Sequence, residues 1–304
     1  MARRACRARS KLRRRVPVDR GADIARADGS GGGFIEALSH YLVAAGFICL
    51  IGAWTFYVLG QVRFAAVASY GTLATYLGLA ALSLAVITRW IAAGRAPYAN
   101  QYEFAIAFAW GATVTFAYIE RQFRFRPLGI AVLPIPILLI IYARTLPPQV
   151  VNVTPLVPAL QNNLLLTVHV AMAVIAYGAF AVACGGAILY LLHRGEATPR
   201  LPPRERIDAL CYRAVIVGFP CMALVLILGA AWGNIAWGRY WGWDPKETAA
   251  LTTWLIYAGY IHAHSLRSWR GTRTSILLLI GFGATLFTYF GNLFLGGLHA
   301  YSGL

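Results

Sequence analysis

The sequence is poor in acidic residues and lacks the cysteine motifs of redox proteins. Only 11 of its 304 residues are Asp or Glu, against 27 Lys and Arg, so the formal net charge is +16. The five cysteines form neither a C-x-x-C pair nor a C-x-x-C-H motif, which excludes a thiol reductase and a c-type cytochrome. Ten of the cations precede residue 27, and most others lie in short segments between apolar runs. This pattern is typical of membrane topology, so we expect no nucleic-acid partner.

Hydrophobic residues, by contrast, are abundant enough to exclude an ordinary soluble domain. They make up 59% of the chain, and the mean hydropathy is +0.61. About 20 helical residues cross the hydrocarbon core of a bilayer, and helices are the form that pairs every backbone group there. We therefore predict an all-α polytopic membrane protein with about eight transmembrane helices, at residues 37–60, 69–91, 103–120, 127–146, 163–193, 212–232, 248–266 and 273–296.

Residues 1–33 differ in composition from the rest of the chain. They are rich in Arg and then in Gly, and they contain no apolar centre of the kind that a signal peptide has. We predict a disordered basic N-terminal tail at residues 1–33, followed by an integral membrane domain at residues 34–304.

The cations of the internal segments predict which side of the membrane each segment faces. Twelve Lys and Arg fall on one side and five on the other, and the cytoplasmic side carries the excess of positive charge. The segment between the sixth and seventh spans then faces outward, to the periplasm or the lumen. With eight spans both termini would also face outward, which conflicts with the basic tail. We give the internal segments more weight and leave this conflict open.

Four tryptophans lie close together between the sixth and seventh predicted spans. They are Trp232, Trp237, Trp241 and Trp243, in the stretch WGNIAWGRYWGWDPKE at residues 232–247. Trp and Tyr are typical of an interfacial belt, but this stretch holds nearly half of the chain's nine tryptophans. Glycines between the rings let the backbone turn or come close to a flat molecule. We favour an outer Trp-rich loop that binds a large planar ligand over a belt alone.

The end of the Trp-rich loop has the pattern of a helix start. Asp244 is placed to serve as the N-cap, Pro245 takes the first helical position, and Glu247 lies three residues after the cap. The pattern predicts a capping box that fixes the aromatic segment rigidly to the next helix.

A Trp-rich loop that ends in WDPKET between two spans resembles the Trp-rich (WWD) domain of the CcsA (ResC) family, which belongs to system II of cytochrome c biogenesis. The stretches RWIAAGRAPYANQYEF at residues 89–104 and PLVPALQNN at residues 155–163 also resemble this family. In the first stretch, Glu103 lies near the N-terminus of a predicted helix, where the helix macrodipole favours a carboxylate. We prefer this explanation of Glu103 to a role as a ligand. The resemblance extends over residues 37–304 and implies a haem-handling protein.

Two of the six histidines are predicted to lie at the outer level, beside the Trp-rich loop. His169 is near the outer end of the fifth span, and His299 follows the eighth span. Two imidazoles that face each other across an aromatic floor are what a bis-histidine haem requires. Two unrelated interfacial histidines would give the same pattern. In the family, histidines flank the Trp-rich domain at these places, so the resemblance implies that both bind the haem iron. It implies a haem-binding surface that also includes Trp232, Trp237, Trp241, Trp243 and Asp244.

His262 is predicted to lie deep in the membrane. It is 17 residues after Pro245, or about 25 Å along a helix, and so lies toward the inner leaflet. An ionisable residue at that depth is a functional hypothesis by default. Its motif, IYAGYIHAHSLR, resembles the family's span histidine. We favour an inner haem contact over a structural hydrogen bond.

The resemblance implies a function in the maturation of c-type cytochromes. Haem b, as the transported substrate, would move from an inner site near His262 to the outer site and be presented to an apocytochrome with a C-x-x-C-H motif. The family works with a second membrane protein, CcsB (ResB), as a cytochrome c synthase in the bacterial inner (plasma) membrane or the thylakoid membrane. We identify no nucleophile or general acid, so the expected contribution is to position haem.

Two other classes of protein remain open. A b-type haem electron carrier would hold a permanent haem, but it usually has histidine pairs on facing helices at both levels, and only the outer level has a clear pair here. A membrane transporter of a non-haem aromatic or lipid solute would use the Trp-rich loop as a gate.

Overall fold

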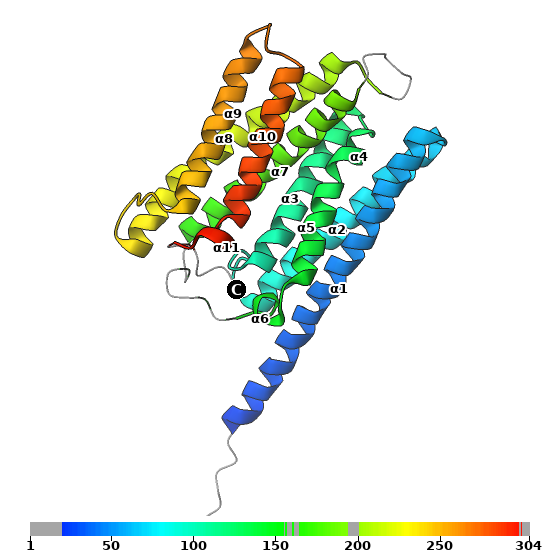
Figure 1. Cartoon of the computed structure of the whole chain (residues 1–304). Coiled ribbons are helices and arrows are strands. Elements are labelled where there is room, and N and C mark those ends of the chain that lie inside the picture. The colour runs from blue at the N-terminus through cyan, green and yellow to red at the C-terminus, as the bar shows by residue number, and fades with distance from the viewer. Residues whose placement is uncertain are drawn as a thin grey trace, which may run out of the picture.

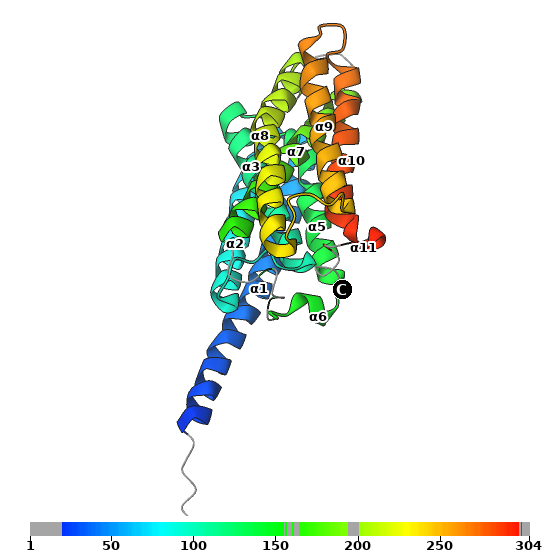
Figure 2. The same ribbon diagram turned by 90° about the vertical axis from the view of Figure 1, so that its left-hand side faces the viewer.

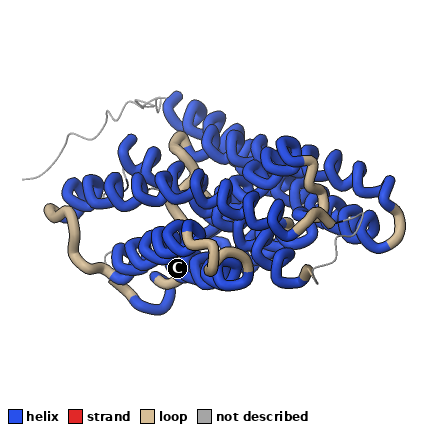
Figure 3. Tube along the Cα trace, turned by 90° about the horizontal axis from the view of Figure 1, so that it is seen from above, coloured by secondary structure: helices blue, strands red, loops and turns tan. Residues whose placement is uncertain are grey.

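The computed structural model describes residues 20–154, 156, 160, 164–193, 201–297 and 299, and these residues are almost entirely helical. Figure 3 shows the helices joined by loops, so the predicted all-α fold is confirmed. The elements are α1 (Arg20–Val62), η1 (Ala65–Val67), α2 (Ala68–Ala93), α3 (Gln101–Phe123), α4 (Leu128–Val132), α5 (Pro134–Thr145), α6 (Pro148–Val151), α7 (Leu164–Leu192), α8 (Arg204–Trp237), α9 (Pro245–Ser265), α10 (Thr272–Phe290) and α11 (Asn292–Leu295).

Seven helical segments of the described chain are long and apolar enough to cross a membrane, which confirms a polytopic membrane protein. They correspond to seven of the eight predicted spans. The fourth consists of α4 and α5, which meet where Pro134 cannot donate a backbone hydrogen bond. The predicted seventh span corresponds to α9, which is not among the seven but packs against α8 and α10. The number of eight crossings therefore stays a prediction.

The helices form an elongated bundle, with α7 in its interior (Figure 1 and Figure 2). α7 packs against α3, α4, α8 and α10, whereas α1 and α2 pair with each other at one side. Figure 1 shows the loop between α8 and α9 and the short helix α11 at the same end of the bundle. The Trp-rich loop and the segment that carries His299 therefore meet at one end of the fold.

Small residues let α3 and α7 touch backbone to backbone at the centre of the bundle. A Cβ added at Gly178 would lie 2.6 Å from the carbonyl oxygen of Gly111, and one added at Gly111 would lie 2.6 Å from Val174 Cγ1. Lipid tails are as apolar as the helices, so close van der Waals packing of this kind drives helix association in membranes.

Gly178→Ala should therefore destabilise the bundle. The new methyl group would meet backbone atoms of α3, which cannot move aside as a flexible side chain can, and overpacking of this kind costs about 1–3 kcal/mol. Gly259→Ala is the matched control, because nothing lies within 4 Å of a Cβ added there. Thermal unfolding in detergent should show a lower melting temperature for Gly178→Ala alone. Equal melting temperatures for the two variants would contradict the close contact.

The prediction that the Trp-rich loop begins at Trp232 is wrong. α8 continues to Trp237, so the loop itself is confined to residues 238–244. At 34 residues, α8 is about 50 Å long, which exceeds the roughly 30 Å of the hydrocarbon core and carries its ends beyond the lipid. It ends at Gly238, whose φ of 73° is the left-handed conformation that favours glycine.

The predicted N-terminal tail lies only partly within the described chain. α1 begins at Arg20, inside the predicted tail, and residues 1–19 lie outside the described residues. The division into a tail at residues 1–33 and a membrane domain at residues 34–304 therefore stays a prediction.

Candidate functional site

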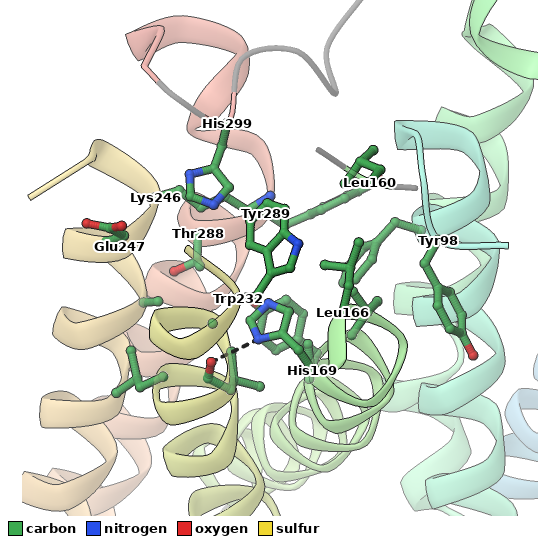
Figure 4. A pocket seen from close by; sticks show the side chains of 18 of the residues that line it. Tyr98, Leu160, Leu166, His169, Trp232, Lys246, Glu247, Thr288, Tyr289 and His299 are labelled. Carbon is green, nitrogen blue, oxygen red and sulfur yellow. Dashed lines mark hydrogen bonds between the residues drawn. The ribbon is translucent and has the colours of Figure 1, made fainter. Parts of the chain in front are cut away.

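A cavity opens at the end of the bundle that carries the Trp-rich loop. It lies between α3, α7, α8, α9 and α10, and the free space between its lining atoms, including its open mouth, is about 1090 Å³. His169 and His299 both line the cavity, together with Trp232, Trp241 and Tyr289. Figure 4 shows His169, His299 and Trp232 around the same space. The structure thus brings together two histidines that are far apart in the sequence, while their role as ligands stays a prediction.

A backbone carbonyl of α8 fixes the orientation of His169. Its Nδ1 donates to the carbonyl oxygen of Val225 at 2.9 Å, so the lone pair of the neutral ring lies on Nε2. Gly229, one turn further along α8, makes room for the imidazole, because a Cβ there would lie 2.9 Å from Cε1 of the ring. This is the tautomer that binds a metal through Nε2.

His299 is held in a similar way by a carboxylate. Its Nδ1 donates to Oδ1 of Asp244 at 2.9 Å, and its ring centre lies 4.7 Å from that of Trp237. Burial lowers the pKa of His299 below its usual value of 6.5, and the Lys246 ammonium lowers it further, while Asp244 and Glu247 oppose both effects. His299 is therefore mostly neutral at pH 7, with the lone pair of its ring on Nε2.

The four predicted tryptophans do not all face the cavity. Trp232, only 2% exposed, lines it from α8, and Trp241 lines it from the loop. Trp237 packs edge-on against Trp232, with ring centres 4.7 Å apart, and supports it without lining the cavity. Trp243 is 69% exposed and contacts Trp241 at a ring-centre distance of 5.7 Å. Of the four tryptophans, Trp232 and Trp241 therefore line the cavity, and a ligand contact for Trp243 stays a prediction.

The predicted capping box at the start of α9 is confirmed. The backbone N–H of Lys246 donates to Oδ1 of Asp244 at 2.9 Å. In return, Oε2 of Glu247 accepts from the backbone N–H groups of Asp244 and Gly242, at 3.1 and 2.9 Å. Asp244 thus both caps α9 and orients His299, which ties the loop, the helix and the histidine into one unit.

One wall of the cavity comes from the residues just before α3 and from the first residue of that helix. Residues 98–101 line the cavity, and Glu103 holds this segment by accepting from the backbone N–H of Ala99 at 2.9 Å. Glu103 itself does not line the cavity. Of the family-like stretch at 155–163, the structure describes positions 156 and 160, and Leu160 lines the cavity as well.

Glu103 belongs to a buried charge network that the sequence did not reveal. Its Oε1 lies 3.2 Å from Nε of Arg89, and its Oε2 lies 2.8 Å from Nη1 of Arg95. Arg89 also donates to Oε1 of Glu36 at 3.1 Å and to the carbonyl oxygen of Val151 at 2.6 Å. The side chain of Glu103 is 0% exposed and that of Arg89 is 4% exposed. The helix macrodipole alone therefore does not account for Glu103; two arginines neutralise it.

His262 does not line this cavity. It is exposed near the end of α9, whereas its neighbour His264 is buried. His264 Nε2 lies 2.9 Å from Oδ2 of Asp208, and its ring stacks on Tyr212 with ring centres 4.4 Å apart. Neither contact is apparent from the sequence, because Asp208 precedes His264 by 56 residues and no motif links them. An inner haem contact for His262 stays a prediction.

Comparison with known proteins establishes the family. A family model described as "Cytochrome C assembly protein" matches residues 98–299. The chain belongs to this family. The matched range begins at Tyr98 and ends at His299, the first and last residues that line the cavity, so the whole site lies within it. Membership places this cytochrome c assembly protein in cytochrome c biogenesis.

Curated relatives of this assembly protein are CcsA proteins, which confirms the resemblance seen in the sequence. It is 33% identical to the cytochrome c biogenesis protein CcsA of Guillardia theta, over 84% of this chain and 93% of that protein. The identity to CcsA of Pyropia yezoensis is 34%, over 77% and 87% of the two chains. For CcsA of Synechococcus elongatus it is 33%, over 74% and 85%.

A solved structure, that of the cytochrome c haem lyase CcmF, resembles the fold with a TM-score of 0.63 at 16% sequence identity. The match covers 84% of this chain but 46% of that one, so the chain spans about half the length of the haem lyase. At this identity the likeness shows a shared fold of the membrane helices.

Proposed function

We propose that this cytochrome c assembly protein binds haem in the outer cavity between His169 and His299, and presents it for attachment to an apocytochrome c. The observation that carries the proposal is that both imidazoles enter one cavity, each with its Nδ1 bonded to an acceptor. Each neutral ring therefore has its lone pair on Nε2. A haem iron takes four nitrogens from its macrocycle, so two histidines complete its coordination.

The walls of the cavity support a flat apolar ligand. Trp232 and Trp241 offer aromatic faces, and Val170, Ala173 and Leu226 contribute aliphatic surface. Burial of apolar area stabilises a bound macrocycle by about 25 cal/mol per Å². The walls therefore supply affinity, while the two imidazoles fix the position of the iron.

The chain contributes position rather than acid or base chemistry. Attachment joins each haem vinyl group to a cysteine thiol of the C-x-x-C-H motif, and haem b carries the two vinyl groups that this requires. Holding haem in one orientation beside the thiols makes the reaction effectively unimolecular. In this proposal the protein is the CcsA-type subunit of a CcsA–CcsB synthase, with the Trp-rich loop on the periplasmic or lumenal side.

In this proposal His262 would help to deliver haem to the outer cavity and would not be a ligand of the haem bound there. It lies at the far end of α9 from Asp244 and exposes its side chain on the surface of the bundle. A haem contact there would need a second surface over α9, which a CcsB-type partner would provide.

The proposal is tested by haem transfer in a purified system. The protein is purified with CcsB, loaded with reduced haem and mixed with an apocytochrome that carries C-x-x-C-H or its S-x-x-S-H variant. We expect covalent haem on the first substrate alone, measured by mass spectrometry. Haem that binds but never transfers would support an electron carrier instead, and the absence of a Soret band would support a transporter of another solute.

Two variants of Asp244 distinguish its role as the N-cap of α9 from its role as the hydrogen-bond acceptor for His299. Asp244→Asn keeps an acceptor for the Lys246 N–H, since Asn caps helices as well as Asp does, but it removes the charge beside His299. Asp244→Ala removes both, and loss of the cap costs about 0.5–2 kcal/mol. We expect haem affinity to fall about 10–100-fold in both variants, as for other groups that support a metal ligand. The melting temperature should fall only in Asp244→Ala; unchanged affinity in both would contradict the role of Asp244.

A further inference from the structure

One of the chain's two lysines lies in the haem cavity. Lys11 lies outside the described residues, and every other side-chain cation except Lys246 is an arginine. Lys246 takes the second position of α9 and lines the cavity that contains both histidines. Figure 4 shows Lys246 beside His299, on the side of the cavity away from Tyr98.

The carboxylates nearest to Lys246 in the sequence are already engaged. Asp244 accepts from the backbone N–H of Lys246 and from His299 Nδ1, and Glu247 accepts from two backbone N–H groups of the loop. Within the described part of the chain, no salt bridge involves Lys246. The cavity therefore holds a partly buried ammonium group that interacts electrostatically with Asp244 but forms no salt bridge with those residues.

An ammonium group in an otherwise largely apolar cavity is unfavourable unless an anion pairs with it. A ligand that binds the two histidines can supply an anion that pairs directly with the ammonium group. A haem macrocycle meets this requirement, because its propionate side chains are ionised carboxylates at neutral pH. One ion pair inside the cavity would neutralise both charges and would be stronger than the same pair in water.

We propose that Lys246 binds a carboxylate of the haem macrocycle and so sets its rotation about the axis through His169 and His299. Two axial imidazoles alone fix the iron but leave that rotation undetermined. Anchoring the acidic edge also fixes the opposite edge, where a vinyl group must meet a cysteine thiol. This inference rests on the proposed haem site and adds a selectivity for macrocycles that carry a free carboxylate.

The test compares iron protoporphyrin with its dimethyl ester, which keeps the iron and the vinyl groups but has no charge on the propionates. Both are titrated by Soret absorbance into the purified full-length parent, Lys246→Met and Lys246→Arg. The parent should bind the acid form about 10–100-fold more tightly than the ester, the range expected for a hydrogen bond to a charged group. Lys246→Met should bind both forms with equal affinity, and Lys246→Arg should keep the preference.

Arg239→Gln is the matched control, because Arg239 is an exposed cation of the loop before α9 and does not line the cavity. It should keep the full preference for the acid form. An independent readout uses an amine-reactive acylating reagent and mass spectrometry, since Lys246 is the sole lysine after residue 11. Bound protoporphyrin should protect Lys246 from acylation, and the ester should not.

The outcomes separate this inference from the proposed function. Equal affinity of the parent for the acid and the ester, or a preference that survives in Lys246→Met, would overturn the role of Lys246 and leave the histidine site intact. The parent comparison needs no variant, so a misfolded Lys246→Met would not obscure the result. If neither form gave a haem spectrum that depends on His169 and His299, the proposed haem site itself would fall, and the inference with it.

Discussion

His169→Ala and His299→Ala should each abolish cytochrome c maturation while the protein still folds and inserts. Either change leaves the haem iron with one axial ligand in a cavity whose other walls stay in place. Added imidazole should restore part of the activity in both variants, because it fits the space that the side chain leaves. The measurement is the amount of covalently bound haem in c-type cytochromes of cells that carry each variant.

His40→Ala is the matched histidine control for this experiment. It removes a hydrogen bond of the same length, 2.9 Å between Nδ1 of His40 and the hydroxyl of Tyr102, but His40 does not line the cavity. Maturation should stay close to that of the parent. Normal maturation in both His169→Ala and His299→Ala would show that the cavity is not the haem site.

The second large effect is expected at Arg89, in the charge network behind the cavity wall. Arg89→Met leaves Glu103 buried with one of its two arginines, and removal of one partner of a buried ion pair typically costs about 3–5 kcal/mol. Glu103 also holds the backbone of Ala99, so the wall formed by residues 98–101 should loosen. We expect a markedly lower melting temperature and weaker haem binding in detergent.

Two further variants identify the cause of that effect. Arg95→Met removes the other, more exposed arginine, whose side chain is 16% exposed, and should cost less. Arg89→Met combined with Glu103→Gln should recover part of the lost stability, since it removes the uncompensated buried charge. The loss of stability caused by Glu103→Gln is also measured in the parent. An equal loss in the Arg89→Met background would show that the two residues do not interact.

Local patterns carried enough information to predict the helices and the start of α9. Apolar runs of about 20 residues mark the spans because lipid forces such segments into helices. The capping box was predictable because its members, Asp244 and Glu247, lie within one helical turn. That His169 and His299 lie at the same end of the bundle followed from counting predicted crossings, since an even number of spans returns the chain to the same side.

Contacts between distant segments were not predictable in the same way. The Glu103–Arg89 and His264–Asp208 pairs join different helices, and no spacing in the sequence marks them. We predicted a loop from Trp232 onward because Trp and Gly are typical of loops. In the structure α8 continues to Trp237 and ends at Gly238. Lys246 was not among the predicted site residues, because its place in the cavity depends on how α9 packs against α8 and α10.

The central claim is that one haem lies between His169 and His299, and ligand-sensitive spectroscopy tests it most directly. Absorption and resonance Raman spectra are recorded for haem bound to the purified parent and to His169→Ala, His299→Ala and His262→Ala. His262 is 17 residues along α9 from Pro245, or about 25 Å, too far to share that haem. We expect the bis-histidine signature of the parent to persist in whatever haem remains in His262→Ala and to be lost in the other two variants. A ligand signature that changes in His262→Ala but not in His169→Ala or His299→Ala would contradict the account.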